Sequence, residues 1–186
     1  MKKECRFCGY GGQGIILAGI ILAEAAAIFE DRYVVQTQDY GPAARGDSSK
    51  TDVIISDGPI DYPKCSRLDL LVALSQRGFE ENKNHLKEGG ILIVDSNNVR
   101  PSVGTPTHGL PMTEVARDRI GSPMSVNMMA LGAAVALSRV ARLESVCSAM
   151  LARVPERTKE WNLAALRMGY ELAEGCARPK RKGRPK

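Results

Sequence analysis

A glycine-rich segment near the start of the chain has the spacing of a loop that holds a phosphate. It reads Gly9-Tyr10-Gly11-Gly12-Gln13-Gly14 and contains the pattern Gly-x-Gly-x-x-Gly. We expect it to follow a strand and to open a helix, where glycine permits a sharp turn and the close approach of a phosphate to backbone amides. The first N–H groups of that helix would also attract an anion. The candidate ligand-binding residues here are Gly9, Gly11, Gly12, Gln13 and Gly14.

The residues around this segment leave its ligand open. A dinucleotide site has an acid about 20 residues further on, at the end of the second strand, which binds the ribose hydroxyls. Here the expected second strand ends at Gln38, and Asp39 lies one step into the following loop. Gly12 is also an extra glycine relative to the ordinary pattern. Three interpretations remain: a phosphate-bearing ligand, a dinucleotide such as NAD, and a tight turn without a ligand.

A second loop has residue types suited to a charged ligand. It reads DYGPAARG, in which Tyr40 offers a flat amphipathic contact and Arg45, followed by Gly46, offers a planar fork for a carboxylate or phosphate. Ser75 and Gln76 follow another apolar run of strand length. Because ligands of open α/β sheets bind beyond the carboxyl ends of the strands, we expect these residues to line one sheet edge. The alternative for this loop is an ordinary polar connection.

We predict no catalytic residue and no metal site in this chain. Cys5 and Cys8, two of the five cysteines, have metal-ligand spacing, but both fall in the first expected strand. Positions three apart in a strand point to opposite faces, so we expect two buried apolar thiols. Only His85 and His108 are available for a histidine site, and the Gly-x-Ser-x-Gly, Gly-Lys-Ser/Thr and His-Glu-x-x-His motifs are all missing. A cofactor-style loop without chemical machinery is typical of one component of a larger enzyme.

Apolar runs of strand length alternate with helical segments along the chain. We predict strands over 3–8, 33–38, 53–56, 68–74 and 91–94, helices over 15–30, 76–86, 113–119, 125–140, 143–154 and 156–176, and loops over 39–50 and 97–111. Gly89-Gly90 is interpreted as a helix stop and Thr113 as a helix cap. The strands are continuously apolar, which favours cover on both faces. The predicted fold class is α/β: a doubly wound, mostly parallel sheet with a Rossmann-like first βαβ unit and a helical C-terminal extension.

Composition bounds the class of protein. With 186 residues, we expect one domain over 1–176 and a basic, disordered tail over 177–186. The tail carries six of the 26 basic residues, so the net charge of +5 does not indicate a specific nucleic-acid partner. No apolar run reaches the roughly 20 residues of a membrane span, and the N-terminus does not resemble a signal peptide. We therefore expect a cytoplasmic protein with no membrane partner.

Several motifs, in the same order, resemble those of a known family. They are the Gly9–Gly14 segment followed by Leu22-Ala23-Glu24-Ala25, the Tyr40–Gly46 loop, Ile55-Ser56-Asp57, Leu74–Gln76, Gly89–Asp95 and Asn127–Gly132. Together they are similar to the gamma subunits of 2-oxoacid:ferredoxin oxidoreductases over about residues 5–170. Asp47 departs from the family pattern, which usually has a second glycine at that position.

The resemblance implies a subunit of an oxidoreductase complex that converts a 2-oxoacid, with 2-oxoglutarate favoured, to an acyl-coenzyme A. In that family, thiamine diphosphate, Mg and iron–sulfur clusters belong to alpha, beta and delta-type subunits, and electrons pass to ferredoxin. The resemblance implies that this chain binds no cofactor firmly and is inactive alone, and we expect the isolated chain to self-associate. The Gly9–Gly14 segment and Arg45 would then face coenzyme A or the subunit seam. The alternatives are a stand-alone NAD-binding oxidoreductase and a ligand-free interaction module.

Overall fold

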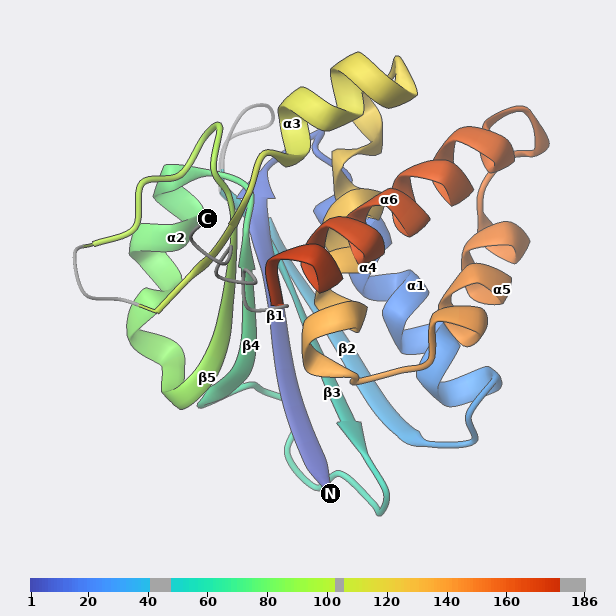
Figure 1. The fold of residues 1–186 in the computed structure, drawn as a ribbon. Coiled ribbons are helices and arrows are strands. Elements are labelled where there is room, and N and C mark those ends of the chain that lie inside the picture. The colour runs from blue at the N-terminus through green and yellow to red at the C-terminus, as the bar shows by residue number, and fades with distance from the viewer. Residues whose placement is uncertain (41–47, 103–105, 178–186) are drawn as a thin grey trace, which may run out of the picture.

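Six strands form one sheet between layers of helices in the computed structural model, which describes residues 1–40, 48–102 and 106–177 (Figure 1). The strands are β1 (Lys2–Tyr10), β2 (Tyr33–Tyr40), β3 (Ser48–Ser56), β4 (Leu68–Ala73), β5 (Leu86–Asp95) and β6 (His108–Leu110). Their order across the sheet is β2-β3-β1-β4-β5-β6. The α/β fold class predicted from the sequence is confirmed.

Strand β3 makes the sheet mixed. It runs antiparallel to both β1 and β2, whereas β1 pairs in parallel with β4, β4 with β5, and β5 with β6. The first β-α-β unit is present, but β3 lies between two strands that are neighbours in a Rossmann domain. Because β1 and β2 still run in the same direction, the carboxyl ends of β1, β2, β4 and β5 meet at one edge of the sheet. This is the edge at which the sequence predicted a ligand site.

Helices cover both faces of the sheet, as its continuously apolar strands require. One face lies under a layer formed by α1 (Ile15–Ile28), α4 (Val126–Ser138), α5 (Leu143–Arg153) and α6 (Lys159–Ala177). The other face packs against α2 (Gln76–Asn82). Side chains alternate along β1, so that Phe7 is buried on the α1 face and Cys8 on the α2 face. The sheet is therefore wound on both sides.

Helices α4 and α6 cross at two glycines. A Cβ on Gly132 would lie 1.9 Å from the carbonyl oxygen of Leu166, and a Cβ on Gly169 would lie 1.9 Å from that of Met129. The two backbones are therefore in direct contact, and any side chain at either glycine would push the helices apart. Through this crossing the C-terminal helices join the same core as the sheet.

Two predicted boundaries around the sheet were wrong. The predicted helix over 76–86 ends as α2 at Asn82, is followed by the 3₁₀ turn η1 (Lys83–His85), and β5 already begins at Leu86. Gly89, with φ of 74°, lies inside β5, opposite a register shift between Leu68 and Leu70 of β4. The glycine pair therefore marks an irregularity of the strand rather than a helix stop. Strand β3 also begins earlier than predicted, because the polar residues before Val53 pair with both neighbouring strands.

The region after β5 also differs from the prediction. The loop expected over 97–111 contains β6, which pairs with the end of β5. Helix α3 (Met112–Val115) continues into a π-helical turn, η2 (Ala116–Ile120), and its N-cap position is Pro111. Thr113 is not a cap, since its hydroxyl and N–H both donate to the buried Asp95 carboxylate. The 3₁₀ turns η3 (Pro123–Ser125) and η4 (Glu156–Thr158) precede α4 and α6.

The chain ends beyond α6 in the predicted basic tail, which from residue 178 onward lies outside the described residues. Within the described ranges, every helix is too short or too polar to traverse a bilayer.

Candidate functional site

The Gly9–Gly14 segment joins the end of β1 to the start of α1, which is the position predicted for it. Gly12 and Gly14 have φ angles of 94° and 73°, a left-handed backbone that favours glycine. The Tyr10 N–H donates a 2.6 Å hydrogen bond to Gln13 Oε1, and a Cβ on Gly9 would lie 2.4 Å from that oxygen. The turn itself therefore requires small residues at these positions.

Asn127 fixes the end of this segment to α4. Its Nδ2 donates to the Gly14 carbonyl oxygen at 3.2 Å, and the residue is only 4% exposed. A Cβ on Gly14 would lie 2.2 Å from the same Nδ2 atom. The glycine segment is thus held between the first turns of α1 and α4. Asn127 belongs to one of the sequence motifs, but its contact with Gly14 was not predicted.

The first turn of α1 is suited to an anion. Its N-cap residue is Gly14, no side chain caps the helix, and the first turn carries no acidic residue. No atom lies within 4 Å of the place that a Cβ on Gly12 would occupy. The N–H groups at a helix start carry partial positive charge and bind phosphate groups well. The geometry therefore fits a phosphate-bearing ligand that approaches over Gly12.

The remaining predicted residues belong to the same edge or to the undescribed loop. Tyr40 ends β2 and is 62% exposed, while Arg45 and Gly46 lie outside the described residues. The buried Ser75 hydroxyl accepts the Gly78 N–H at 3.1 Å and caps α2. Gln76 Oε1 accepts the Arg100 N–H at 2.7 Å. Ser75 and Gln76 therefore fix α2 at this edge, and their contact with a ligand stays a prediction.

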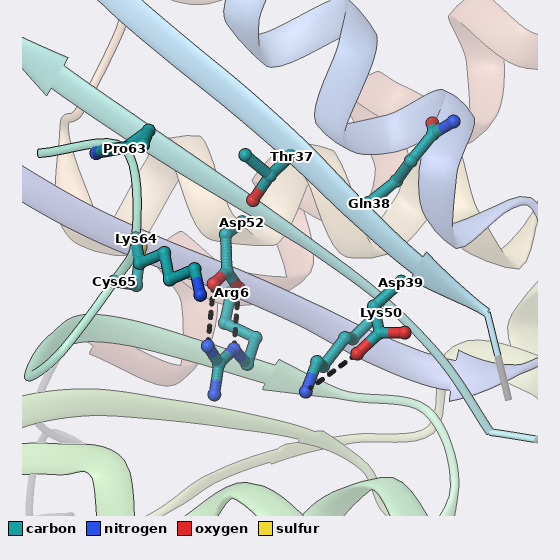
Figure 2. Close-up of a pocket in the computed structure, with 9 residues that line it drawn as sticks. All are labelled: Arg6, Thr37, Gln38, Asp39, Lys50, Asp52, Pro63, Lys64 and Cys65. Carbon is teal, nitrogen blue, oxygen red and sulfur yellow. Dashed lines mark hydrogen bonds and ion pairs between the residues drawn. The ribbon is translucent and has the colours of Figure 1, made fainter.

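A charged cavity on the sheet face opposite α1 was not predicted (Figure 2). Arg6 Nε and one terminal nitrogen each donate to Asp52 at 2.6 Å, and the other terminal nitrogen donates to Asn82 Oδ1 at 3.0 Å. Arg6 and Asp52 are 5% and 9% exposed. A charge inside an otherwise apolar strand needs a partner when it is buried. In the sequence, an arginine between the apolar residues Cys5 and Phe7 was therefore the signal that could have indicated a buried ion pair.

Cys5 and Cys8 are buried on opposite faces of β1, as predicted from their spacing. Burial raises the pKa of each thiol to about 12, so both remain protonated near neutral pH. A protonated, buried thiol is a poor metal ligand. The pair therefore fills the core on two sides of the sheet.

Asp39, the acid considered for an NAD ribose, does not lie beside the glycine segment. Its carboxylate forms an ion pair with Lys50 Nζ at 3.2 Å, and β3 separates β2 from β1. The arrangement differs from the dinucleotide-binding one, in which the second strand is the direct neighbour of the first.

Comparison with known proteins agrees with these features. Residues 4–172 match the family model described as pyruvate ferredoxin/flavodoxin oxidoreductase. The chain belongs to this family. The 2-oxoglutarate synthase subunit KorC of Methanocaldococcus jannaschii is 46% identical over 178 residues, which cover 94% of this chain and 95% of KorC. The pyruvate synthase subunit PorC of Methanothermobacter marburgensis is 29% identical, over 90% of this chain and 96% of PorC.

A solved oxidoreductase structure has the same fold over nearly the whole chain. It is the keto/oxoacid ferredoxin oxidoreductase gamma subunit of Geobacter sulfurreducens, with a TM-score of 0.87, 44% identity, and coverage of 95% of this chain and 98% of that one. The resemblance to gamma subunits of 2-oxoacid:ferredoxin oxidoreductases is therefore confirmed.

The cofactors of such oxidoreductases fit this chain unequally. The open first turn of α1 and the Gly12 backbone suit the phosphates of coenzyme A. Among residues 1–40, 48–102 and 106–177, no group of three His, Cys, Asp or Glu side chains is arranged to hold a metal ion. Cys5 and Cys8 cannot share an iron–sulfur cluster, because they face opposite sides of β1. The described residues thus fit a phosphate-bearing group.

Proposed function

We propose that this chain is the gamma subunit of a complex that oxidatively decarboxylates 2-oxoglutarate to its acyl-coenzyme A and reduces ferredoxin. The observation that carries the proposal is the difference in identity between two relatives, both matched over nearly their full length. The chain is 46% identical to a 2-oxoglutarate synthase subunit and 29% identical to a pyruvate synthase subunit. The higher identity to the 2-oxoglutarate synthase subunit favours 2-oxoglutarate over pyruvate as the substrate of the complex.

The role of this chain in the complex is to bind and orient coenzyme A. Coenzyme A supplies the thiol that accepts the acyl group and carries several phosphates. The N–H groups of the first turn of α1 would bind a phosphate, and the open backbone at Gly12 allows it to approach. Asn127 keeps Gly14 and that turn in place. Tyr40, the last residue of β2, and Arg45, five positions further along the sequence, would contact the same ligand or the seam with another subunit.

The chemistry itself would take place on other subunits. The resemblance to the family assigns thiamine diphosphate with Mg and the iron–sulfur clusters to alpha, beta and delta-type partners. We expect the isolated chain to be inactive and the complex to be cytoplasmic, with ferredoxin reached through the complex. The exposed Tyr40 and Tyr62 would be covered by those partners rather than by a membrane or a nucleic acid.

The proposal is tested by reconstituting the complex with and without this chain. Reduction of ferredoxin, driven by 2-oxoglutarate and dependent on coenzyme A, should be lost on omission and restored when the chain is added back. Pyruvate should support a much lower rate. Full activity without the chain would favour the stand-alone NAD-binding alternative, which a thermal-shift measurement of the chain with NAD would then examine.

Arg45→Ala tests the coenzyme A role directly. The variant complex should need about tenfold more coenzyme A for half-maximal rate, since a charge-assisted contact with phosphate contributes about 1.5 kcal/mol. The KM for 2-oxoglutarate should stay unchanged. Arg139→Ala, at the C-terminal end of α4 and therefore far from the glycine segment, is the matched control. An unchanged coenzyme A requirement in a normally assembled complex would contradict this role.

A further inference from the structure

The charged cavity on the face opposite α1 is a second concave site of the molecule. It has a volume of about 390 Å³ and is lined by β1, β2, β3 and the connection from β3 to β4. Its lining residues are Arg6, Thr37, Gln38, Asp39, Lys50, Asp52, Pro63, Lys64 and Cys65. Ligand pockets usually measure about 300–1,000 Å³, so this one suits a small molecule. It lies across the sheet from α1, the helix that the proposed function assigns to coenzyme A.

The charges around the cavity do not cancel. Three cations and two carboxylates line it. Asp52 is held by both of its oxygens on Arg6, and Asp39 forms its ion pair with Lys50. Lys64 is the cation left over: no ion pair or hydrogen bond joins its ammonium to any residue of the described ranges. The cavity therefore carries a surplus of one positive charge.

Lys64 is placed to offer this charge to a ligand. It comes from the β3–β4 connection, and its side chain extends over the cavity toward the paired Arg6 and Asp52 (Figure 2). The Arg6–Asp52 pair is held in a fixed position, because the Arg6 guanidinium also donates a hydrogen bond to Asn82 of α2. A lysine ammonium has three donors and no acceptor, and here it can satisfy them only with an anion or with water.

We propose that this cavity binds a small organic carboxylate through Lys64. One surplus positive charge matches the single charge of a carboxylate better than the higher charge of a phosphate. The adjacent Thr37 hydroxyl offers a further donor at the cavity wall. Binding is non-covalent, since burial raises the pKa of the Cys65 thiol well above its usual range and keeps it protonated. The inference does not depend on the proposed function, because Lys64, Arg6, Asp52 and Thr37 are not among the residues assigned to coenzyme A.

Titration of the ¹⁵N-labelled full-length chain tests the proposal. Acetate, pyruvate, 2-oxoglutarate and inorganic phosphate would be added separately, with sodium chloride at matched ionic strength as the reference. The amide signals of Thr37, Lys64 and Cys65 should shift saturably with at least one carboxylate and at least tenfold less tightly with phosphate. Lys64→Met should weaken carboxylate binding at least tenfold while the rest of the spectrum stays unchanged.

Lys83→Met is the matched control, because Lys83 does not line the cavity and its ammonium forms an ion pair with Glu80. It should bind the carboxylates as tightly as the unmodified chain. Equal affinity in the Lys64 variant, tighter binding of phosphate, or no saturable shift with any probe would overturn the proposal. Since the spectrum reports folding as well as binding, a misfolded variant would be recognised, and Lys64→Gln would then replace it.

Discussion

The glycine segment and the charged cavity, which lie on the two faces of the sheet, are built by different means. On the α1 face, the glycine segment is shaped by backbone atoms and by the absence of side chains at Gly9, Gly12 and Gly14. On the opposite face, the cavity is shaped by charged side chains, with the hydrogen-bonded pair of Arg6 and Asp52 at its centre. The first site tolerates no added atom at its contacts, whereas the second tolerates no lost partner.

This difference decides how each face responds to change. A left-handed glycine in contact with a neighbour meets both backbone strain and a steric clash when it gains a Cβ. A buried ion pair that loses one member leaves an uncompensated charge, which costs more than the pair itself contributes. Substitutions on the two faces should therefore differ in how much stability they cost. They should also differ in which second substitution restores part of that stability.

Asp52→Ala should have the largest effect on stability. It leaves the Arg6 guanidinium buried with only Asn82 as a partner, and losing one member of a buried pair costs about 3–5 kcal/mol. Urea unfolding followed by circular dichroism would measure the loss, as a lower midpoint with an unchanged slope.

The double variant Arg6→Met/Asp52→Leu sharpens this prediction. It removes both charges and keeps most of the buried volume, so it should be clearly more stable than Asp52→Ala alone. A double variant as unstable as the single one would mean that the side-chain volume, rather than the unpaired charge, determines stability on this face.

Gly14→Ala should have the second-largest effect. The left-handed backbone of Gly14 costs an alanine about 1–2 kcal/mol, and its Cβ would also meet Asn127 Nδ2 at 2.2 Å. We expect a loss of about 2–3 kcal/mol, again from urea unfolding, because the clash adds to the strain.

Gly12→Ala separates these two costs. Gly12 has a left-handed φ of 94° but nothing within 4 Å of the Cβ position, so only the strain of about 1–2 kcal/mol should appear. Adding Asn127→Ala to Gly14→Ala should recover part of the loss, and adding it to Gly12→Ala should recover none. Equal losses for both glycine variants would show that the contact with Asn127 contributes nothing.

The sequence predicted the backbone-built face far better than the side-chain-built one. Glycine spacing and a following helix indicate a turn without knowledge of distant residues, and the Gly9–Gly14 segment lies where expected. The hydrogen-bond partners of Arg6 come from β3 and α2, and the partner of Gly14 comes from α4. These contacts depend on how distant elements are arranged in the fold, which local sequence patterns do not encode. For the same reason β3 was expected to be shorter. Its polar first half becomes a strand only because Lys50 and Asp52 find partners on β2 and β1.

The smallest expected effect is a pH dependence that comes from the carboxyl groups of Glu4 and Asp69. Burial tends to raise the pKa of Glu4, but the N–H groups of Arg67 and Ser66 outweigh it and lower the pKa below its usual value. Burial also tends to raise the pKa of Asp69. The hydrogen bond from the Glu4 N–H and the nearby Lys87 and Lys3 outweigh it, so the pKa of Asp69 is lowered.

A carboxyl group with a lowered folded-state pKa stabilises the fold above its unfolded value, about 4 for Asp and Glu, and this contribution is lost as the pH falls through the folded value. The free energy of unfolding should therefore be steady from about pH 7 to 5 and decline below about pH 4. Glu4→Gln/Asp69→Asn should flatten the decline, whereas the exposed Glu160→Gln should leave it unchanged. If the decline stayed as steep in the double variant, the acid sensitivity would not come from Glu4 and Asp69.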